Sequence, residues 1–287
     1  MGFEALKKVK VGDLQVAFRE EGNGEPMLLI HGWPLSSLTW RKVVPRLSAS
    51  ARCIAPDLLG AGETLGDPAQ DHSFPVQAKI VEGFMDAIGL SKATVIGHDS
   101  GGTVARMLAI ANPGRVSRLV LADTEVPGHK PTLVRLLKAM LGLPGSMALF
   151  AAMTRSKVLA KSPLGFGTSF SDLKAFDFDE FFRVTLAPLG RSEQAMRSTL
   201  KFLKDFRFED VDATQASYGA LTMPKYVMWG EDDRIFPLEQ GWRLRDMLPE
   251  PVRFDMFPNA GLLIHEEQPE AWAGAVRSFL KYTAAEG

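Results

Sequence analysis

The chain has a single cysteine, Cys53, among its 287 residues, which excludes an internal disulfide and a multi-thiolate metal site. It also lacks a basic excess, because 33 Lys and Arg stand against 34 Asp and Glu, and this argues against a nucleic-acid-binding surface. No apolar run approaches the roughly 20 residues of a membrane span. The N-terminal stretch MGFEALKKVKVGD has no signal-peptide core. We therefore expect a cytoplasmic protein without a nucleic-acid or membrane partner.

Short β-branched runs alternate with longer helical patterns, which is typical of a parallel α/β sheet. An antiparallel pair is expected first, around the turn Gly12-Asp13. Residues 38–47 have approximate helical spacing, and helices are predicted over 74–88, with Ser73 as N-cap, and over 270–282. The buried strands are predicted over 27–30, 52–55, 93–96, 119–121, 226–229 and 252–256.

The middle of the chain has a different pattern. From 128 to 212 no strand pattern appears, and ten phenylalanines and four methionines accompany helical pieces broken by proline and glycine. We expect this stretch to be a helical cap over the carboxyl ends of the strands, with residues 1–127 and 213–287 forming the core. Such a cap favours a small apolar organic substrate.

The sharpest local pattern is Val95-Ile96-Gly97-His98-Asp99-Ser100-Gly101-Gly102, a strand, a tight turn and a helix start. This pattern presents its central residue on a strained turn at the sheet edge, where it acts as a nucleophile. The central residue is Asp99. Ser100 comes one position later, where its side chain should point away from the turn. The alternative is that Asp99 only caps the following helix.

Three more motifs follow predicted strands. His31-Gly32-Trp33-Pro34 places the Trp33 backbone N–H where it can form an oxyanion hole with the N–H of Ser100. Trp229 to Pro237 contains Asp233, and Phe257 to Gly261 follows the last strand. Together these motifs resemble the α/β-hydrolase superfamily, in its aspartate branch of haloalkane and haloacetate dehalogenases and epoxide hydrolases. The resemblance implies a mostly parallel eight-stranded sheet flanked by helices, with a helical cap.

The resemblance also implies a role for each matching residue. Asp99 would attack an alkyl halide or epoxide carbon and form an alkyl ester. Asp233 would orient the catalytic histidine, with Asp123 as the alternative acid. The histidine itself is missing, because Leu262 stands at its position and leucine cannot activate water. His265, three residues later, is the alternative base. His31, His98, His129 and Tyr218 complete the side chains predicted at the substrate.

We therefore expect a hydrolase with an aspartate nucleophile that is impaired in the hydrolytic half of its reaction. The alternatives are a non-hydrolytic enzyme of this fold and a ligand-binding protein for an apolar molecule. Ser100 and Thr103 replace arginines of haloacetate dehalogenases, so small carboxylate substrates lack a clamp. No cofactor or metal is predicted, and the chain is expected to be a monomer or a homodimer.

Overall fold

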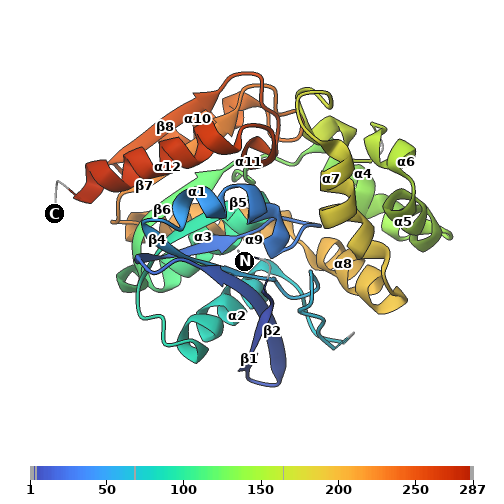
Figure 1. Cartoon of the computed structure of the whole chain (residues 1–287), viewed down its shortest axis with the longest axis horizontal. Helices are drawn as coiled ribbons and strands as arrows, with labels where there is room; N and C mark the ends of the chain where they lie inside the picture. Colours follow the sequence, from blue (N-terminus) through green and yellow to red (C-terminus); the bar gives the residue numbers. More distant parts are fainter. Residues whose placement is uncertain (1–2, 4, 68, 164, 285–287) are drawn as a thin grey trace.

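The computed structural model describes residues 3, 5–67, 69–163 and 165–284. Its centre is an eight-stranded sheet in the order β1-β2-β4-β3-β5-β6-β7-β8 (Figure 1). β2 pairs antiparallel with β1 and with β4, and every other pair in the sheet is parallel. The mostly parallel eight-stranded sheet is therefore confirmed, including the opening antiparallel pair.

The strands contain all the runs expected from the sequence. β5 and β7, in the middle of the parallel part, have no exposed residue, as expected for strands covered on both faces. The strands are β1 (Lys7–Val11), β2 (Leu14–Glu21), β3 (Glu25–Ile30), β4 (Ala51–Pro56), β5 (Ala93–His98), β6 (Val116–Ala122), β7 (Lys225–Gly230) and β8 (Val252–Phe257).

Helices cover both faces of the sheet, and each face has its own apolar core. The helices predicted over 74–88 and 270–282 are present, as α2 and α12, and 38–47 contains a 3-10 turn and α1. The Ser73 hydroxyl donates to Asp71 and does not cap α2. The helices of the core are α1 (Val44–Leu47), α2 (Phe74–Ala87), α3 (Ser100–Ala111), α10 (Leu238–Met247), α11 (Ile264–Glu267) and α12 (Pro269–Ala284).

The described residues between 128 and 212 contain helices and no strand. Figure 1 shows α4 to α8 gathered at one end of the molecule, far from the C-terminus. α9 differs, because it packs against α3 of the core. The outer limits of the predicted core segments, 1 and 287, lie outside the described residues. The helices of this stretch are α4 (Thr132–Leu141), α5 (Ser146–Arg155), α6 (Lys157–Lys161), α7 (Phe178–Phe181), α8 (Glu193–Asp205) and α9 (Phe208–Thr214).

Candidate active site

Asp99 lies at the tip of a sharp turn between β5 and α3. Its φ of 51° lies in the left-handed region that a non-glycine residue rarely adopts. The Asp99 carbonyl accepts 2.8 Å hydrogen bonds from the Gly102 N–H and the Thr124 hydroxyl, which hold the turn. A Cβ on Gly101 would lie 2.2 Å from the Ile30 carbonyl oxygen, so only glycine allows this approach of helix to strand.

The side chain of Asp99 does not cap α3, although the residue occupies the N-cap position. The capping alternative is therefore wrong. The carboxyl group instead receives hydrogen bonds from the backbone N–H groups of Ser100 and Trp33, which lower its pKa. Desolvation is the larger effect and, with the nearby carboxyls of Glu125 and Asp233, raises the pKa of Asp99 well above its usual range.

Asp99 faces a cavity of about 80 Å³ between the core and the 128–212 stretch. A second cavity of about 140 Å³ adjoins it, because the two share Trp33, Leu133, Leu137 and Phe166. The described residues that line the first cavity include no lysine or arginine. They are Trp33, Pro34, Leu35, His98, Asp99, Leu133, Val134, Leu137, Gly165, Phe166, Ser169, Ile235, Leu262 and Leu263.

Trp33 connects the loop after β3 to two other parts of the molecule. Its backbone N–H donates to the Oγ of Ser100 at 2.8 Å, so the Ser100 side chain points at this loop, and Ser100 does not line the cavity. The Trp33 indole N–H donates to the carbonyl oxygen of Thr199 in α8, also at 2.8 Å. The indole N–H is therefore occupied by this hydrogen bond to α8 and is not free to bind a leaving group.

Two acids follow neighbouring strands beside the elbow. Asp123 follows β6 and accepts a 2.8 Å hydrogen bond from the Gly230 N–H. Asp233 follows β7 and accepts from the N–H groups of Ile235 and Phe236 at 2.7 and 3.0 Å. The second oxygen of each carboxyl has no donor, so the pair can share a proton. Burial raises the pKa of Asp233 to about 7 and that of Asp123 well above its usual range.

Leu262 lines the cavity together with Asp99, which places an isobutyl group at the site where a base was expected. The Leu262 carbonyl accepts a 2.8 Å hydrogen bond from the Nε2 of His98. His98 therefore also lines the cavity but is tied to the loop that carries Leu262, and burial lowers its pKa to about 4. It is a neutral positioning residue.

His265 does not line the cavity. Its ring is fully buried against Trp40, with ring centroids 4.7 Å apart, and its Nε2 lies 2.7 Å from the Thr39 hydroxyl. Burial and the neighbouring His98 hold the pKa of His265 well below its usual range. The geometry thus contradicts the alternative that His265 replaces the missing base.

Three other side chains predicted at the substrate also lie away from the cavity. His31 uses both ring nitrogens on the backbone, with Gly32 O and Leu58 N each 3.0 Å away. The Tyr218 hydroxyl accepts a 2.7 Å hydrogen bond from the buried Arg106 guanidinium. His129 packs beside Phe236, outside the cavity lining. These expectations were wrong: hydrogen bonds within the core hold His31 and Tyr218, and the half-buried His129 lies outside the cavity lining.

Sequence reasoning missed two acids of the site, Glu125 beside Asp99 and Glu267 beside Asp123 and Asp233. Glu125 is buried and accepts a 2.7 Å hydrogen bond from the Thr103 hydroxyl, which also accepts from Arg106. Glu267 binds the Gly261 N–H at 2.7 Å and so fixes the loop before Leu262. The only signal for Glu125 was its place just after Asp123 at the end of a buried strand.

The site is therefore a half-closed apolar cavity with one carboxyl group, Asp99, aimed into it, and further acids behind. Among the described residues, no group of three or more His, Cys, Asp or Glu side chains is arranged to hold a metal ion. Such a site can hold an uncharged organic molecule against Asp99 while the two backbone N–H groups polarise the carboxyl.

Known proteins match this chain over most of its length. It is 26% identical to a 2-hydroxy-6-oxo-2,4-heptadienoate hydrolase of Pseudomonas putida, over 96% of each chain. It is 28% identical to a soluble epoxide hydrolase of Corynebacterium sp., over 87% of each, and 27% identical to haloalkane dehalogenase 2 of Mycobacterium bovis, over 91% of this chain and 90% of that one.

A solved α/β-hydrolase-fold protein from Burkholderia ambifaria superposes with a TM-score of 0.80 at 26% identity, over 96% of this chain and 97% of that one. The model of the α/β-hydrolase fold family matches residues 25–269. With the sheet order and the elbow already described, this match places the chain in the α/β-hydrolase family.

Proposed function

We propose that Asp99 attacks an sp³ carbon of an apolar alkyl halide or epoxide. An Asp99 oxygen forms a bond to that carbon while the carbon–halogen or ring C–O bond breaks, and the electron pair leaves with the halide or alkoxide. The product is an alkyl ester on the protein. A ring-opened alkoxide takes its proton from solvent or from a neutral acid of the site.

One observation carries this proposal: the Asp99 carboxyl sits on a strained turn, faces the apolar cavity and receives two backbone N–H groups. This combination of a strained backbone, a cavity-facing carboxyl and two N–H groups is typical of a functional aspartate and not of a structural one. The epoxide hydrolase and haloalkane dehalogenase among the relatives support the same class of electrophile.

The hydrolytic half is impaired in this proposal, because no base stands where water must be activated. Leu262 fills that place, and a general base typically contributes about 10²–10⁴-fold to such a step. The ester would accumulate, and the protein would behave as a single-turnover reagent unless another reaction removes the alkyl group.

A second candidate is a ligand-binding or non-hydrolytic protein of the same fold. It is favoured by the raised pKa of Asp99, since a neutral carboxyl is a poor nucleophile but a good hydrogen-bond donor. In this case an apolar ligand with a carbonyl or ether oxygen would accept from Asp99.

Intact-mass analysis distinguishes the two candidates. The chain and its Asp99→Asn variant are incubated with primary bromoalkanes, iodoalkanes and terminal epoxides. The first proposal predicts a mass gain of one alkyl group, which peptide mapping assigns to Asp99 and which the variant lacks. Saturable ligand binding without any mass gain across the panel would support the second candidate and overturn the first.

A further inference from the structure

The cap presents an unusual surface to solvent. Nine large apolar side chains are exposed among the described residues, and five of them lie between residues 136 and 159. None of the ten residues of α4 is buried. We call the exposed side chains of α4, α5, α6 and the α4–α5 connection the cap face. Its apolar members are Leu136, Leu143, Leu149, Val158 and Leu159.

The cap face also forms part of the wall of an apolar cavity. Leu136, Leu149 and Leu159 line the 140 Å³ cavity, which adjoins the cavity of Asp99. The apolar patch is thus continuous with the inside of the protein. An exposed patch of this kind, at the entrance to a buried site, marks a surface that binds something apolar.

The stretch of sequence that forms this patch is basic. From residue 126 to residue 171 the sequence contains no Asp or Glu but six Lys and Arg, in a chain whose net charge is −1. Arg135 and Arg155 are exposed and form no ion pair with another described residue. Lys157 and Lys161 share one partner, Asp179. The cap face is therefore both apolar and cationic.

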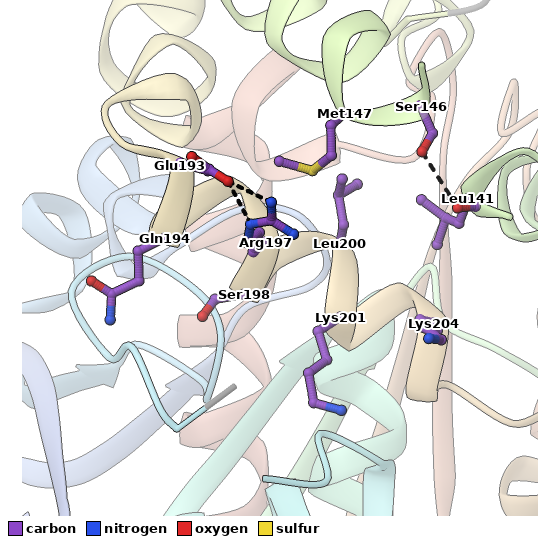
Figure 2. Close-up of a pocket in the computed structure, with 10 residues that line it drawn as sticks. All are labelled: Leu141, Ser146, Met147, Glu193, Gln194, Arg197, Ser198, Leu200, Lys201 and Lys204. Atoms are coloured by element: carbon purple, nitrogen blue, oxygen red, sulfur yellow. Dashed lines mark hydrogen bonds and ion pairs between the residues drawn. The ribbon is translucent and has the colours of Figure 1, made fainter. Parts of the chain in front are cut away.

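A groove of about 630 Å³ continues this surface along α8. Figure 2 shows Leu200 and Met147 reaching into it from α8 and α5, with Lys201 and Lys204 along the same helix. Arg197 is paired with Glu193, whereas Lys204 has no ion-pair partner among the described residues. The apolar side chains of Leu141, Met147 and Leu200 lie in the same groove as the unpaired Lys204, and this combination suits an acyl chain whose headgroup is anionic.

We propose that the cap face docks on an anionic phospholipid bilayer, with the apolar side chains entering the interface and the cations meeting the headgroups. A second copy of this chain fits less well, because a symmetric contact would bring the same unpaired cations together. No single described helix is long and apolar enough to cross a membrane. α4 and α5 together meet the length and composition of a span, but the pair is bent by 119° between them. Docking on the surface replaces the earlier expectation of no membrane partner, which considered spanning segments alone.

The docking does not depend on the chemistry of Asp99, and it would deliver apolar substrate from the lipid to the two adjoining cavities. The test is co-sedimentation of the full chain with vesicles of phosphatidylcholine, alone or with about one-third phosphatidylglycerol. We expect binding to the anionic vesicles that weakens as salt is raised. The Asp99→Asn variant should bind equally, so that failure of docking and failure of the proposed reaction are distinguishable.

Two pairs of variants locate the contact. The triple variant Leu143→Ser, Leu149→Ser, Val158→Ser should lose at least about ten-fold in partitioning. Its control changes three exposed apolar residues outside the cap, Leu6, Trp242 and Met256, to serine. Arg135→Glu with Arg155→Glu should weaken binding by more than about five-fold for each charge. The control Lys8→Glu with Lys281→Glu changes two exposed lysines outside the cap and should leave binding unchanged.

All variants change exposed side chains, and circular dichroism with thermal melting verifies their folding. The proposal is overturned if the parent chain does not bind anionic vesicles at low salt. It is also overturned if cap-face and control variants bind alike. A parent dimer that the cap-face variants dissociate, in a chain that binds no vesicles, would show that a second copy covers this face.

Discussion

The backbone N–H of Trp33 donates to the Oγ of Ser100 at 2.8 Å, beside the carboxyl of Asp99 that it also serves. The same N–H group thus faces two acceptors, the Ser100 hydroxyl and the position where an oxyanion would form. A fully committed oxyanion donor is worth about 10²–10³ in rate. The Ser100 hydroxyl therefore competes with the function assigned to this loop.

Replacing Ser100 by alanine should free this donor. In a Leu262→His background, Ser100→Ala should raise the rate of ester hydrolysis by up to about ten-fold, while a lost buried hydrogen bond costs about 1 kcal/mol of stability. Single-turnover decay of the ester, followed by mass, measures the effect. Ser169→Ala, which alters another serine of the same cavity, is the control and should leave the decay unchanged. An unchanged rate in the Ser100 variant would mean that Trp33 is not an oxyanion donor.

Leu262→His should convert single-turnover behaviour into catalysis. The new imidazole would meet two acids, Asp123 and Asp233, each with a free carboxyl oxygen able to orient it. We expect ester hydrolysis to accelerate by about 10²–10⁴-fold. Halide or diol release measures turnover, and Leu263→His, at the neighbouring lining residue, is the matched control. If the two histidine variants behave alike, position 262 is not the site of the base.

Ester formation should depend on pH. Desolvation raises the pKa of Asp99 well above its usual range, and only the ionised carboxylate attacks carbon. The rate of alkylation should therefore increase ten-fold per pH unit below that pKa and level off above it. The time course of mass gain between pH 6 and 10 checks this, with a solvent-alkylation blank at each pH. A flat profile would show that Asp99 is ionised throughout.

Small halogenated carboxylates should react poorly. The described cavity lining has no cation, and Arg106, one candidate for a clamp, is buried and donates to Tyr218, Thr103 and the Glu125 carbonyl. Chloroacetate should therefore alkylate Asp99 much more slowly than an uncharged chloride of similar size, such as chloroacetamide. Competition between the two, read as adduct masses, gives the ratio. Preferential reaction of chloroacetate would reveal a cation that reaches the cavity.

Asp233→Asn should stabilise the protein. The folded-state pKa of Asp233 is about 7 against an ordinary value of 3.8, so folding takes up a proton between these values. Stability supplied by the neutral carboxyl is present at low pH and is lost as pH rises from about 4 to 7. Asparagine stays neutral and keeps the acceptor for Ile235 and Phe236, so we expect a Tm increase of about 2–4 °C at pH 8. The increase should vanish near pH 4, and a decrease at pH 8 would show that Asp233 is needed as an anion.

The elbow could be predicted from sequence because its determinants are local. Glycines at fixed distances from Asp99, after a buried strand and before a helix, define the turn by themselves. The same holds for Trp33, Asp123 and Asp233, each placed by the end of a strand. The parallel sheet then brings these strand ends together, whatever lies between them in the chain.

Side-chain direction could not be predicted in the same way, because contacts far apart in sequence decide it. His265 turns toward Thr39, 226 residues away, and the Trp33 indole toward Thr199, 166 residues away. Tyr218 is held by Arg106 across 112 residues. Each of these pairings depends on the packed core, and a polar residue near a motif has no local feature that reveals which way it faces.

The bond between the Trp33 indole and Thr199 makes the reactive centre sensitive to the position of the cap. The Trp33 indole donates to α8, and the Trp33 backbone N–H faces the carboxyl of Asp99. A shift of α8 would therefore move the N–H that polarises the nucleophile. A movement of the cap, caused by a membrane or by bound substrate, would thereby change the reactivity of Asp99. Trp33→Phe would remove the hydrogen bond to Thr199 while keeping the Trp33 backbone N–H and α8 in place.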